Sequence, residues 1–289
     1  MVAIRLLRSV AREVVGEEKA REVWSRIDII GDIAIIKKPL RTSLSLEDYR
    51  RIGAKLLERV KYVKSVWLAA SPVEGEYRVR RELIHLAGDK RTVTVYREHG
   101  CSFLVDISKV FVTPRLGFEH YRVAKLVRPG EVIVNMFAGA GIFSIVIARI
   151  ARPSKVYSID INREAVELMK RNVEINSVKD VVVPIHGDAA EVVSRRLSGI
   201  ADRVLMPLPV LAISYLGHAL ESLKDRGALH VYLHISYGKG EDPRDKASGI
   251  VLNEVERLGY SVENIQARVV RPVGPRTVQV VVDAGVLRC

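Results

Sequence analysis

The sequence predicts an α/β protein with a doubly wound, mostly parallel sheet, and three strand ends carry this prediction. An apolar run of strand length, Val132–Val134, leads into a turn that holds Gly139 and Gly141, and apolar residues at helix spacing follow. The second and third strands of this region end in Asp160 and Asp188. The carboxyl ends of parallel strands meet at one edge of such a sheet, where these folds bind their ligands. We therefore expect a ligand site built from a glycine turn and two acids.

The order glycine, acid, acid indicates the kind of ligand. A glycine turn at a helix N-terminus presents free backbone N–H groups, although tight glycine turns without a ligand are also common. Asp160 stands where a doubly wound sheet places an acid for the two hydroxyls of a ribose. Dinucleotide sites usually need a third glycine three residues after the second, and that position is Ser144 here. The series favours S-adenosyl-L-methionine over NAD or FAD, because a ligand without a pyrophosphate does not need that glycine.

Strand and helix patterns alternate from Glu131 to the end of the chain. The expected elements cover residues 132–137, 142–151, 155–161, 163–176, 181–187, 189–197, 203–208, 211–224, 227–235, 244–258, 260–271 and 277–283. Five parallel strands followed by a C-terminal pair, in which Arg276–Asp283 returns antiparallel, give a mixed sheet. Such a sheet is typical of Rossmann-like methyltransferases, and we place this domain at residues 131–289.

The first 130 residues predict a smaller α+β domain preceded by a helix. Residues 1–26 have the periodicity of an amphipathic helix, with a break at Gly16. We expect residues 27–130 to form one domain. Its elements are a β segment over 27–39 with a turn at Gly31–Asp32, a helix from a cap at Ser45 to about Val60, strands over 63–69, 92–96 and 102–107, and a helical run to Val127 before the hinge at 128–130.

Positive charge is concentrated in this first part. The chain of 289 residues has a formal net charge of +12. Residues 1–130 hold 26 Lys and Arg against 16 Asp and Glu, whereas residues 131–289 hold 20 against 18. A nearly neutral cofactor domain preceded by a basic one suggests that the basic part meets a polyanion. A generally basic surface without such a partner is the alternative.

Several classes of protein are not expected. No run approaches the roughly eighteen apolar residues of a membrane span, and the N-terminus has no signal-peptide core, so we expect a cytoplasmic protein. The two cysteines, Cys101 and Cys289, give no disulfide framework. The seven histidines are scattered, and none lies near clustered carboxylates or cysteines. We therefore expect no metal site.

Six short motifs along the chain point to one family. They are Asp28–Lys37, Glu74–Arg78, Leu86–Gly88, Pro114–Leu116 with Glu119, Met136–Gly139 and Asp202–Val204. Together they resemble archaeal tRNA (guanosine-37) N1-methyltransferases, and a sister family that transfers an aminocarboxypropyl group in wybutosine synthesis shares much of the pattern. The resemblance covers roughly residues 27 to 283. It implies a Rossmann-like class I methyltransferase domain, a preceding RNA-facing domain, S-adenosyl-L-methionine as donor, and a monomer that binds the anticodon stem-loop of tRNA, with tRNA-Phe as the expected substrate.

The resemblance implies a cofactor site at the same strand ends. The matching positions are Phe137, Ala138, Gly139 and Gly141 on the methionine side, Asp160 and Ile161 at the ribose, Asp188 and Ala189 at the adenine, and Asn135 and Pro207 nearby. No metal ligand is among them.

It also implies catalytic residues. Glu119 matches a carboxylate proposed as general base. An arginine in the run Arg78–Arg81, with Arg78 and Arg81 as the candidates, matches one proposed to steady the base or the developing charge, and Arg115 lies in the Pro-Arg-Leu motif. Removing the N1 proton of guanine needs a base, and a guanidinium stabilises the negative charge that builds on O6. Each of these residues also has a structural interpretation. Glu119 can be an acid that stabilises the N-terminus of a helix through the helix dipole, and the arginines can belong to a solvent-exposed strand edge with salt bridges.

The sequence departs from the family pattern at four places. Asn135 stands where the family usually has Asp, and His120 replaces the Arg that follows the carboxylate. Pro207 occupies the first position of an Asn-Leu-Pro motif, so no amide orients the guanine there. Family members often carry a small N-terminal domain that inspects the tRNA elbow, whereas only the helix over 2–26 precedes Asp28. We expect such inspection to be absent or done differently.

Four functions stay open at this point. The first is methyl transfer to the purine at position 37 of tRNA, at N1 of guanosine or at a ring carbon of 4-demethylwyosine, and Pro207 weighs against unmodified guanosine. The second is aminocarboxypropyl transfer to the same nucleoside, although Arg115 and Pro209 resemble the methyltransferase branch more. The third is a tRNA-binding protein without catalysis. The fourth, a small-molecule methyltransferase, leaves the basic first domain unexplained.

Overall fold

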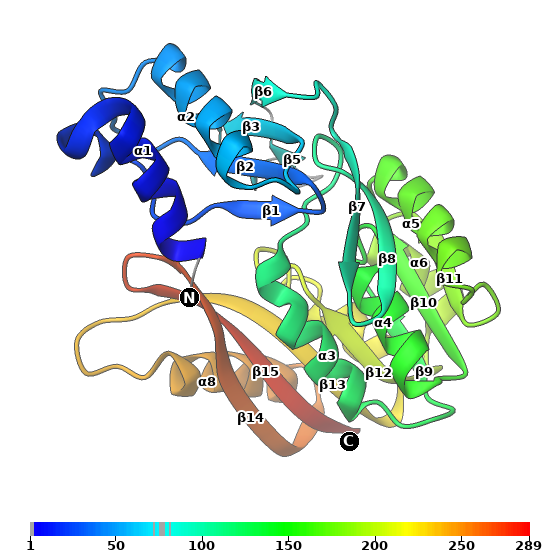
Figure 1. Ribbon diagram of the computed structural model, residues 1–289. Coiled ribbons are helices and arrows are strands. Elements are labelled where there is room, and N and C mark those ends of the chain that lie inside the picture. Colours follow the sequence, from blue (N-terminus) through cyan, green and yellow to red (C-terminus); the bar gives the residue numbers. More distant parts are fainter. Residues whose placement is uncertain (1–2, 72, 75–78, 81) are drawn as a thin grey trace. The chain divides into compact units, whose positions relative to one another are not determined.

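A computed structural model of the chain describes residues 3–71, 73–74, 79–80 and 82–289. It divides into two compact units, Met1–Pro114 and Arg115–Cys289 (Figure 1). The predicted domain boundary after residue 130 differs from this division. Helix α3 (Gly117–Leu126) packs against α4 (Ile142–Ala151), and for that reason it belongs to the second unit.

The first unit has an α+β fold with a four-stranded sheet in the order β1-β2-β3-β6. Strand β2 pairs antiparallel with β1 and parallel with β3, and β6 pairs antiparallel with β3. Two short antiparallel pairs, β4–β5 and β7–β8, form separate sheets. The elements are α1 (Ala3–Ala20), β1 (Asp28–Ile30), β2 (Ile33–Lys37), α2 (Leu46–Arg59), β3 (Ser65–Ala69), β4 (Val73–Glu74), β5 (Val79–Arg80), β6 (Leu83–Gly88), β7 (Val93–Glu98) and β8 (Cys101–Asp106).

Helices α1 and α2 share an apolar core with one face of this sheet. The predicted cap begins α2: the Ser45 hydroxyl accepts a hydrogen bond from the Asp48 N–H, and the Asp48 carboxylate accepts one from the Ser45 N–H. The helix then buries Ile52 and Leu56 in the core. The predicted break in the first helix is present at Gly16, where φ is +81°.

The second unit is built on a seven-stranded mixed sheet in the order β11-β10-β9-β12-β13-β15-β14. The first five strands in this order are parallel, and β15 runs antiparallel to both β13 and β14. The strands are β9 (Val132–Asn135), β10 (Lys155–Asp160), β11 (Val182–His186), β12 (Ala201–Met206), β13 (Leu223–Ser236), β14 (Tyr260–Gly274) and β15 (Thr277–Arg288). This topology confirms the predicted Rossmann-like sheet with its antiparallel return.

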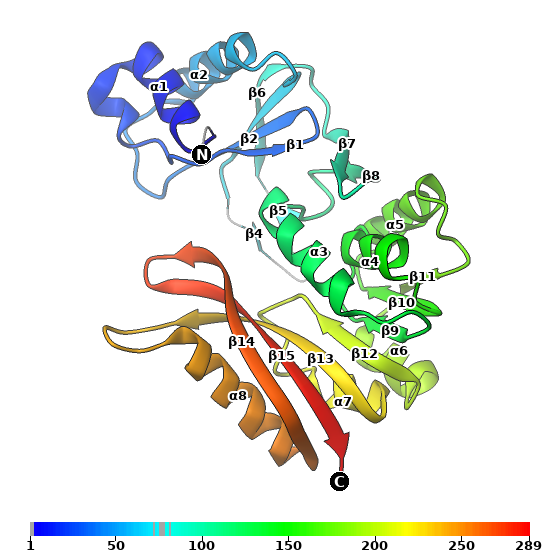
Figure 2. The same cartoon turned by 60° about the horizontal axis from the view of Figure 1, so that its bottom comes forward.

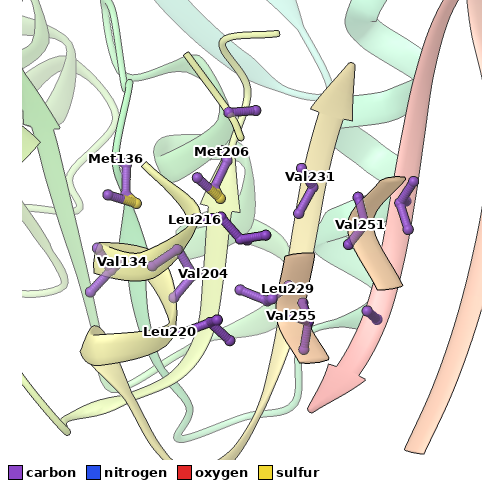
Figure 3. Packing of buried hydrophobic residues seen from close by; sticks show 14 of the residues in the cluster. Val134, Met136, Val204, Met206, Leu216, Leu220, Leu229, Val231, Val251 and Val255 are labelled. Carbon is purple, nitrogen blue, oxygen red and sulfur yellow. The ribbon is translucent and has the colours of Figure 1, made fainter. Parts of the chain in front are cut away.

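Helices cover both faces of the seven-stranded sheet (Figure 2). One face carries α3, α4 and α5 (Arg163–Ile175). The other carries α6 (Ala189–Val192), α7 (Leu216–Ser222) and α8 (Pro243–Arg257), and a π-helical turn over Val193–Leu197 continues α6. On this second face, Val204 and Val231 of the sheet pack with Leu220 of α7 and with Val251 and Val255 of α8 in a fully buried core (Figure 3).

The parallel strands place their carboxyl ends at one edge of the sheet. In register, Asn135 at the end of β9 lies between Ser158 of β10 and Leu205 of β12. The turns that follow these strands therefore start close together and form the candidate site. Within the part of the chain that the structure describes, no helix has both the length and the apolar character needed to cross a lipid bilayer.

Candidate functional site

The turn between β9 and α4 leaves room beside Gly139. Gly139 has a φ of +54° and Gly141 a φ of +86°, in the left-handed region that favours glycine. A Cβ at Gly139 would meet no atom of the described residues within 4 Å, whereas one at Gly141 would lie 2.7 Å from Cγ of Met169. Gly141 is thus needed for packing against α5, and the backbone at Gly139 stays open to a ligand.

Asp160, the last residue of β10, holds this turn in place. Its Oδ2 accepts a 2.7 Å hydrogen bond from the Gly139 N–H, and its Oδ1 accepts a 2.9 Å bond from the Asn162 N–H. Burial raises the pKa of the Asp160 carboxyl, and the two backbone donors oppose that rise. Each carboxylate oxygen has a second lone pair, so acceptors remain for two ribose hydroxyls.

Asp188 stands at the third strand end together with two aromatic rings. Its Oδ1 caps α6 by accepting hydrogen bonds from the N–H groups of Ala190 and Glu191. Its Oδ2 accepts a 2.5 Å hydrogen bond from the Tyr215 hydroxyl. The Tyr215 ring meets Phe137 edge to face, with 5.3 Å between the ring centroids. An acid and two rings are therefore placed together beside the glycine turn.

Ser144 fills the position where a dinucleotide fold has its third glycine. Its Oγ accepts hydrogen bonds from Nδ2 of Asn135 at 3.1 Å and from Oγ of Ser158 at 2.7 Å, and all three side chains are buried. These contacts join α4 to β9 and β10. The other side-chain atom of Asn135, Oδ1, is buried and accepts no hydrogen bond from any described residue. A buried acceptor in this state needs a donor from a ligand or from water.

These features fit S-adenosyl-L-methionine. The open backbone at Gly139, the ribose acceptors of Asp160 and the unmet acceptor of Asn135 suit a polar ligand that carries no phosphate. The rings of Phe137 and Tyr215 supply apolar surface at the same site. Among the described residues, no group of three His, Cys, Asp or Glu side chains is placed to hold a metal ion.

The candidate base, Glu119, lies in the first turn of α3 with only 2% of its surface exposed. Its Oε1 accepts hydrogen bonds from the Tyr232 hydroxyl at 2.8 Å and from Nη2 and Nε of Arg122 at 2.6 and 3.0 Å. Its Oε2 accepts only from Nε of Arg122, at 3.1 Å, among the described residues. The position of the Glu119 carboxylate is therefore fixed by side-chain hydrogen bonds and not by the helix dipole alone. Of its two oxygens, Oε2 accepts fewer hydrogen bonds.

A line of charged side chains continues from Arg122 into the sheet. Nη1 and Nη2 of Arg122 donate to Oδ2 and Oδ1 of Asp283 at 2.5 and 3.2 Å. Oδ1 of Asp283 lies 2.6 Å from Nδ1 of His230, and Nε2 of His230 lies 2.7 Å from Nη1 of Arg203. Arg203 ends the line in an ion pair with Glu131. Since a guanidinium can only donate, Nε2 of His230 accepts and its Nδ1–H donates to Asp283.

The pKa values of this line follow from burial and from these bonds. Burial lowers the pKa of His230, which is therefore neutral. Burial alone would raise the pKa of Asp283, but the hydrogen bonds from His230 and Arg122 and the positive charge of Arg122 lower it to about 2. Burial raises the pKa of Tyr232 well above its ordinary value, so this hydroxyl keeps its proton and donates.

Two sequence matches decide the family. Residues 94–242 match the TRM5/TYW2 methyltransferase domain. Residues 7–92 match the TYW2 N-terminal domain. The chain belongs to the TRM5/TYW2 family. The resemblance that the six motifs indicated is thereby confirmed, as is the Rossmann-like class I methyltransferase fold preceded by a smaller α+β unit.

Relatives within the TRM5/TYW2 family differ in the reaction that their names state. The chain is 41% identical to the tRNA 4-demethylwyosine(37)-methyltransferase Taw21 of Saccharolobus solfataricus, over 91% of this chain and 94% of that protein. It is 38% identical to the tRNA (guanine(37)-N(1))-methyltransferase Trm5b of Pyrococcus abyssi, over 94% of this chain and 78% of that protein. A tRNA(Phe) (4-demethylwyosine(37)-C(7)) aminocarboxypropyltransferase of Methanocaldococcus jannaschii is 31% identical over 88% of this chain and 95% of that protein.

Solved structures of family members share the fold. The crystal structure of Trm5b from Pyrococcus abyssi matches with a TM-score of 0.82 and 37% identity, covering 96% of this chain and 80% of that one. A complex of aTrm5 with tRNALeu matches with a TM-score of 0.81 and 32% identity, covering 96% and 77% of the two chains.

Most of the predicted cofactor residues of this TRM5/TYW2 protein lie in turns at one edge of the sheet. The turn after β9 holds Phe137, Ala138, Gly139 and Gly141. Strand β10 ends at Asp160, and Ile161 is the first residue after it. Asp188 and Ala189 come shortly after β11, and Pro207 is the first residue after β12. Asn135 is instead the last residue of β9 itself, and it is 1% exposed. Its predicted role in binding therefore depends on the one free oxygen of its amide.

The predicted catalytic residues are placed less completely. Arg115 is half-buried in a 3₁₀ turn, one turn before Glu119. His120, which replaces the usual Arg, is buried in α3. Arg78 and Arg81 lie outside the described residues. Their role in catalysis stays a prediction.

Sequence reasoning missed four side chains of the site. Arg122 follows the candidate base by three residues, and this helical spacing was a readable signal. Tyr232 and Asp283 gave no local signal, because only the antiparallel pairing of β13 with β15 brings their strands together. Tyr215 was placed inside a predicted helix over 211–224, whereas α7 begins only at Leu216.

We expect Asp160→Asn to weaken the binding of S-adenosyl-L-methionine about tenfold or more. An amide offers one acceptor and one NH₂ group, so either Gly139 N–H or Asn162 N–H would face a donor. Isothermal titration calorimetry measures the dissociation constant, and Asp180→Asn, at an exposed position, is the matched control. An unchanged dissociation constant in the Asp160 variant would remove this residue from the cofactor site.

Proposed function

We propose that this protein transfers a methyl group from S-adenosyl-L-methionine to the purine at position 37 of tRNA, with a ring carbon of 4-demethylwyosine as the acceptor. Membership of the TRM5/TYW2 family supports group transfer from S-adenosyl-L-methionine to tRNA, and the similarity to the methyltransferases Taw21 and Trm5b supports methyl transfer. The choice of acceptor rests on Pro207, the first residue after β12, whose ring offers no amide to orient an unmodified guanine. The similarity to Taw21, which acts by name on 4-demethylwyosine, supports the same choice.

The proposed chemistry uses Glu119 as the base. When bound, S-adenosyl-L-methionine supplies an electrophilic methyl group. The acceptor atom of the purine would gain that methyl group as the sulfur–methyl bond breaks, with S-adenosyl-L-homocysteine as the leaving group. The proton of the acceptor atom passes to Glu119 through Oε2, the oxygen with fewer hydrogen bonds. Arg122 and Tyr232 hold the other oxygen and keep the carboxylate in one orientation.

A cation is needed where negative charge builds on the purine. We assign this task to Arg115 and to an arginine of the Arg78 and Arg81 pair. A guanidinium can stabilise an oxygen anion through two parallel hydrogen bonds, which lysine cannot do. Arg115 lies one turn before Glu119 in the chain, which supports its part in the proposal.

Two other reactions within the family compete with this proposal. Methylation of guanosine N1 is supported by the similarity to Trm5b. Aminocarboxypropyl transfer to 4-demethylwyosine is supported by the relative of Methanocaldococcus jannaschii. A tRNA-binding protein without catalysis is the candidate of another class.

The partner in this proposal is tRNA, bound through its anticodon stem-loop. The excess of Lys and Arg in residues 1–130 supports the binding of a polyanion. We further propose tRNA-Phe as the substrate, action as a monomer and a place in the cytoplasm. The name of one relative, which states tRNA(Phe), supports the first of these.

Mass spectrometry of nucleosides tests the proposal. Two tRNA-Phe substrates, one with unmodified guanosine 37 and one with 4-demethylwyosine, are incubated with the protein and S-adenosyl-L-methionine. We expect one added methyl group on the tricyclic base only. A methyl group on guanosine would assign N1 chemistry, and the larger aminocarboxypropyl mass would assign the sister reaction. Binding of both tRNAs without any added mass would favour a protein without catalysis.

A further inference from the structure

Arg122 lies between two carboxylates and uses a separate edge of its guanidinium for each. Nε and Nη2 face Glu119, and Nη1 and Nη2 face Asp283. The side chains are largely enclosed: Arg122 is 14% exposed, Glu119 3% and Asp283 19%. Water therefore screens these charges weakly, and the division of one cation between two anions has a large electrostatic effect.

The cluster as a whole carries one excess negative charge. Arg122 balances one of the two carboxylates that it touches. His230 is neutral and adds no charge, and Arg203 is balanced by its ion pair with Glu131. Because His230 and Arg122 hold Asp283 in its charged form, Asp283 competes with Glu119 for the single positive charge of Arg122.

Besides Arg122, the described charged residue nearest to Glu119 along the chain is Arg115, in the 3₁₀ turn that precedes α3. Arg122 and the buried His120 share its helix, and Tyr232 comes from β13. Helix α4 packs against α3, and the one titratable residue of α4, Arg149, is exposed. Arg122 is the charged residue that donates hydrogen bonds to both oxygens of Glu119, and Asp283 acts on Glu119 through Arg122.

We propose that Asp283 is a positioning residue for the reaction: it holds Arg122 against Glu119 and competes with Glu119 for the charge of Arg122, so that Glu119 can act as a base. Asp283 touches no reacting atom and acts through Arg122. It lies outside the stretch 94–242 that matches the methyltransferase domain, on the antiparallel strand β15. This inference rests on the proposed role of Glu119.

The pH dependence of the single-turnover rate tests the proposal, with both substrates saturating. In Asp283→Asn, Arg122 pairs with Glu119 alone, so the acid limb of the profile should move down by about 1 pH unit. The plateau rate should fall on the order of threefold, because a weaker base accepts the proton less readily. Asp283→Glu, which restores the charge, should return the midpoint toward that of the wild type. Glu263→Gln removes a carboxylate from the exposed pair with Arg226 and should change neither quantity.

A second measurement does not depend on turnover. In protein labelled with ¹³C at the glutamate carboxyl, the signal of Glu119 is the one that disappears in Glu119→Gln. Its titration midpoint should also fall by about 1 pH unit in Asp283→Asn. Asp283→Ser removes the same charge and replaces the Asn variant if that variant does not fold.

The two measurements separate the failure of each idea. A Glu119 midpoint that stays unchanged, or rises, in the charge-removing variant would overturn the role of Asp283. A rate that falls equally at every pH, with the midpoint unchanged, would reduce Asp283 to a structural residue and overturn it as well. Absence of methyl transfer by the wild-type protein would contradict the proposed function. The titration of the Glu119 carboxyl would still test whether Asp283 acts on Glu119 through Arg122.

Discussion

Glu119→Gln is expected to lower the single-turnover rate of methyl transfer by about 10²–10⁴-fold, the contribution typical of a general base. Glutamine keeps the shape of the side chain and can still accept from Tyr232 and Arg122, so the fold and the binding of both substrates should be preserved. What it cannot do is take the proton of the acceptor atom. Quench-flow kinetics with radiolabelled S-adenosyl-L-methionine and saturating tRNA measures this rate.

The control for this variant must remove a carboxylate without touching the base. Glu263→Gln does so on the same unit, and its rate should equal that of the wild type. Tyr232→Phe removes one donor to Glu119 and should lower the rate far less than the glutamine variant. A Glu119 variant with more than about a tenth of the wild-type rate would show that another group, or water, accepts the proton.

Local patterns in the sequence predicted the strand ends that form the candidate cofactor site. The glycine turn, Asp160 and Asp188 each follow a strand whose apolar run is visible in the sequence, and α4 covers the predicted residues 142–151. The parallel order of such strands then requires their ends to meet. For this reason the strand ends found in the structure are those that the sequence indicated.

The surroundings of the candidate base depend on contacts between distant residues, which no local sequence pattern contains. Arg122 and Asp283 are 161 positions apart and meet because of the pairing between β13 and β15, which aligns Asp283 with His230. A single Asp near the end of a strand pattern has many possible partners. The register of a long antiparallel pair is a tertiary property, so neither this ion pair nor its effect on Glu119 was predictable from spacing.

Arg122→Met is expected to destabilise the protein by about 3 kcal/mol, which is the effect of leaving buried carboxylates without their cation. The substitution keeps an unbranched side chain but leaves both Glu119 and Asp283 without the cation that they contact. We place the effect at the lower end of the range for buried pairs because Asp283 is partly exposed. Thermal or urea unfolding measures it. Arg257→Met, which breaks an exposed pair with Glu254, should change stability by less than about 1 kcal/mol.

The pH dependence of this loss separates electrostatics from packing. The pKa of Asp283 is about 2 in the folded protein against an ordinary value of 3.8, so the stability linked to it is present above pH 3.8 and is lost as the pH falls toward 2. Without Arg122 this depression shrinks, and the difference in stability between wild type and Arg122→Met should narrow between pH 4 and pH 2. Adding Asp283→Asn to the Met variant should recover part of the loss at neutral pH, because one unpaired charge is removed. A difference that is constant over this range, with no recovery in the double variant, would mean that lost packing around the Arg122 side chain causes the destabilisation.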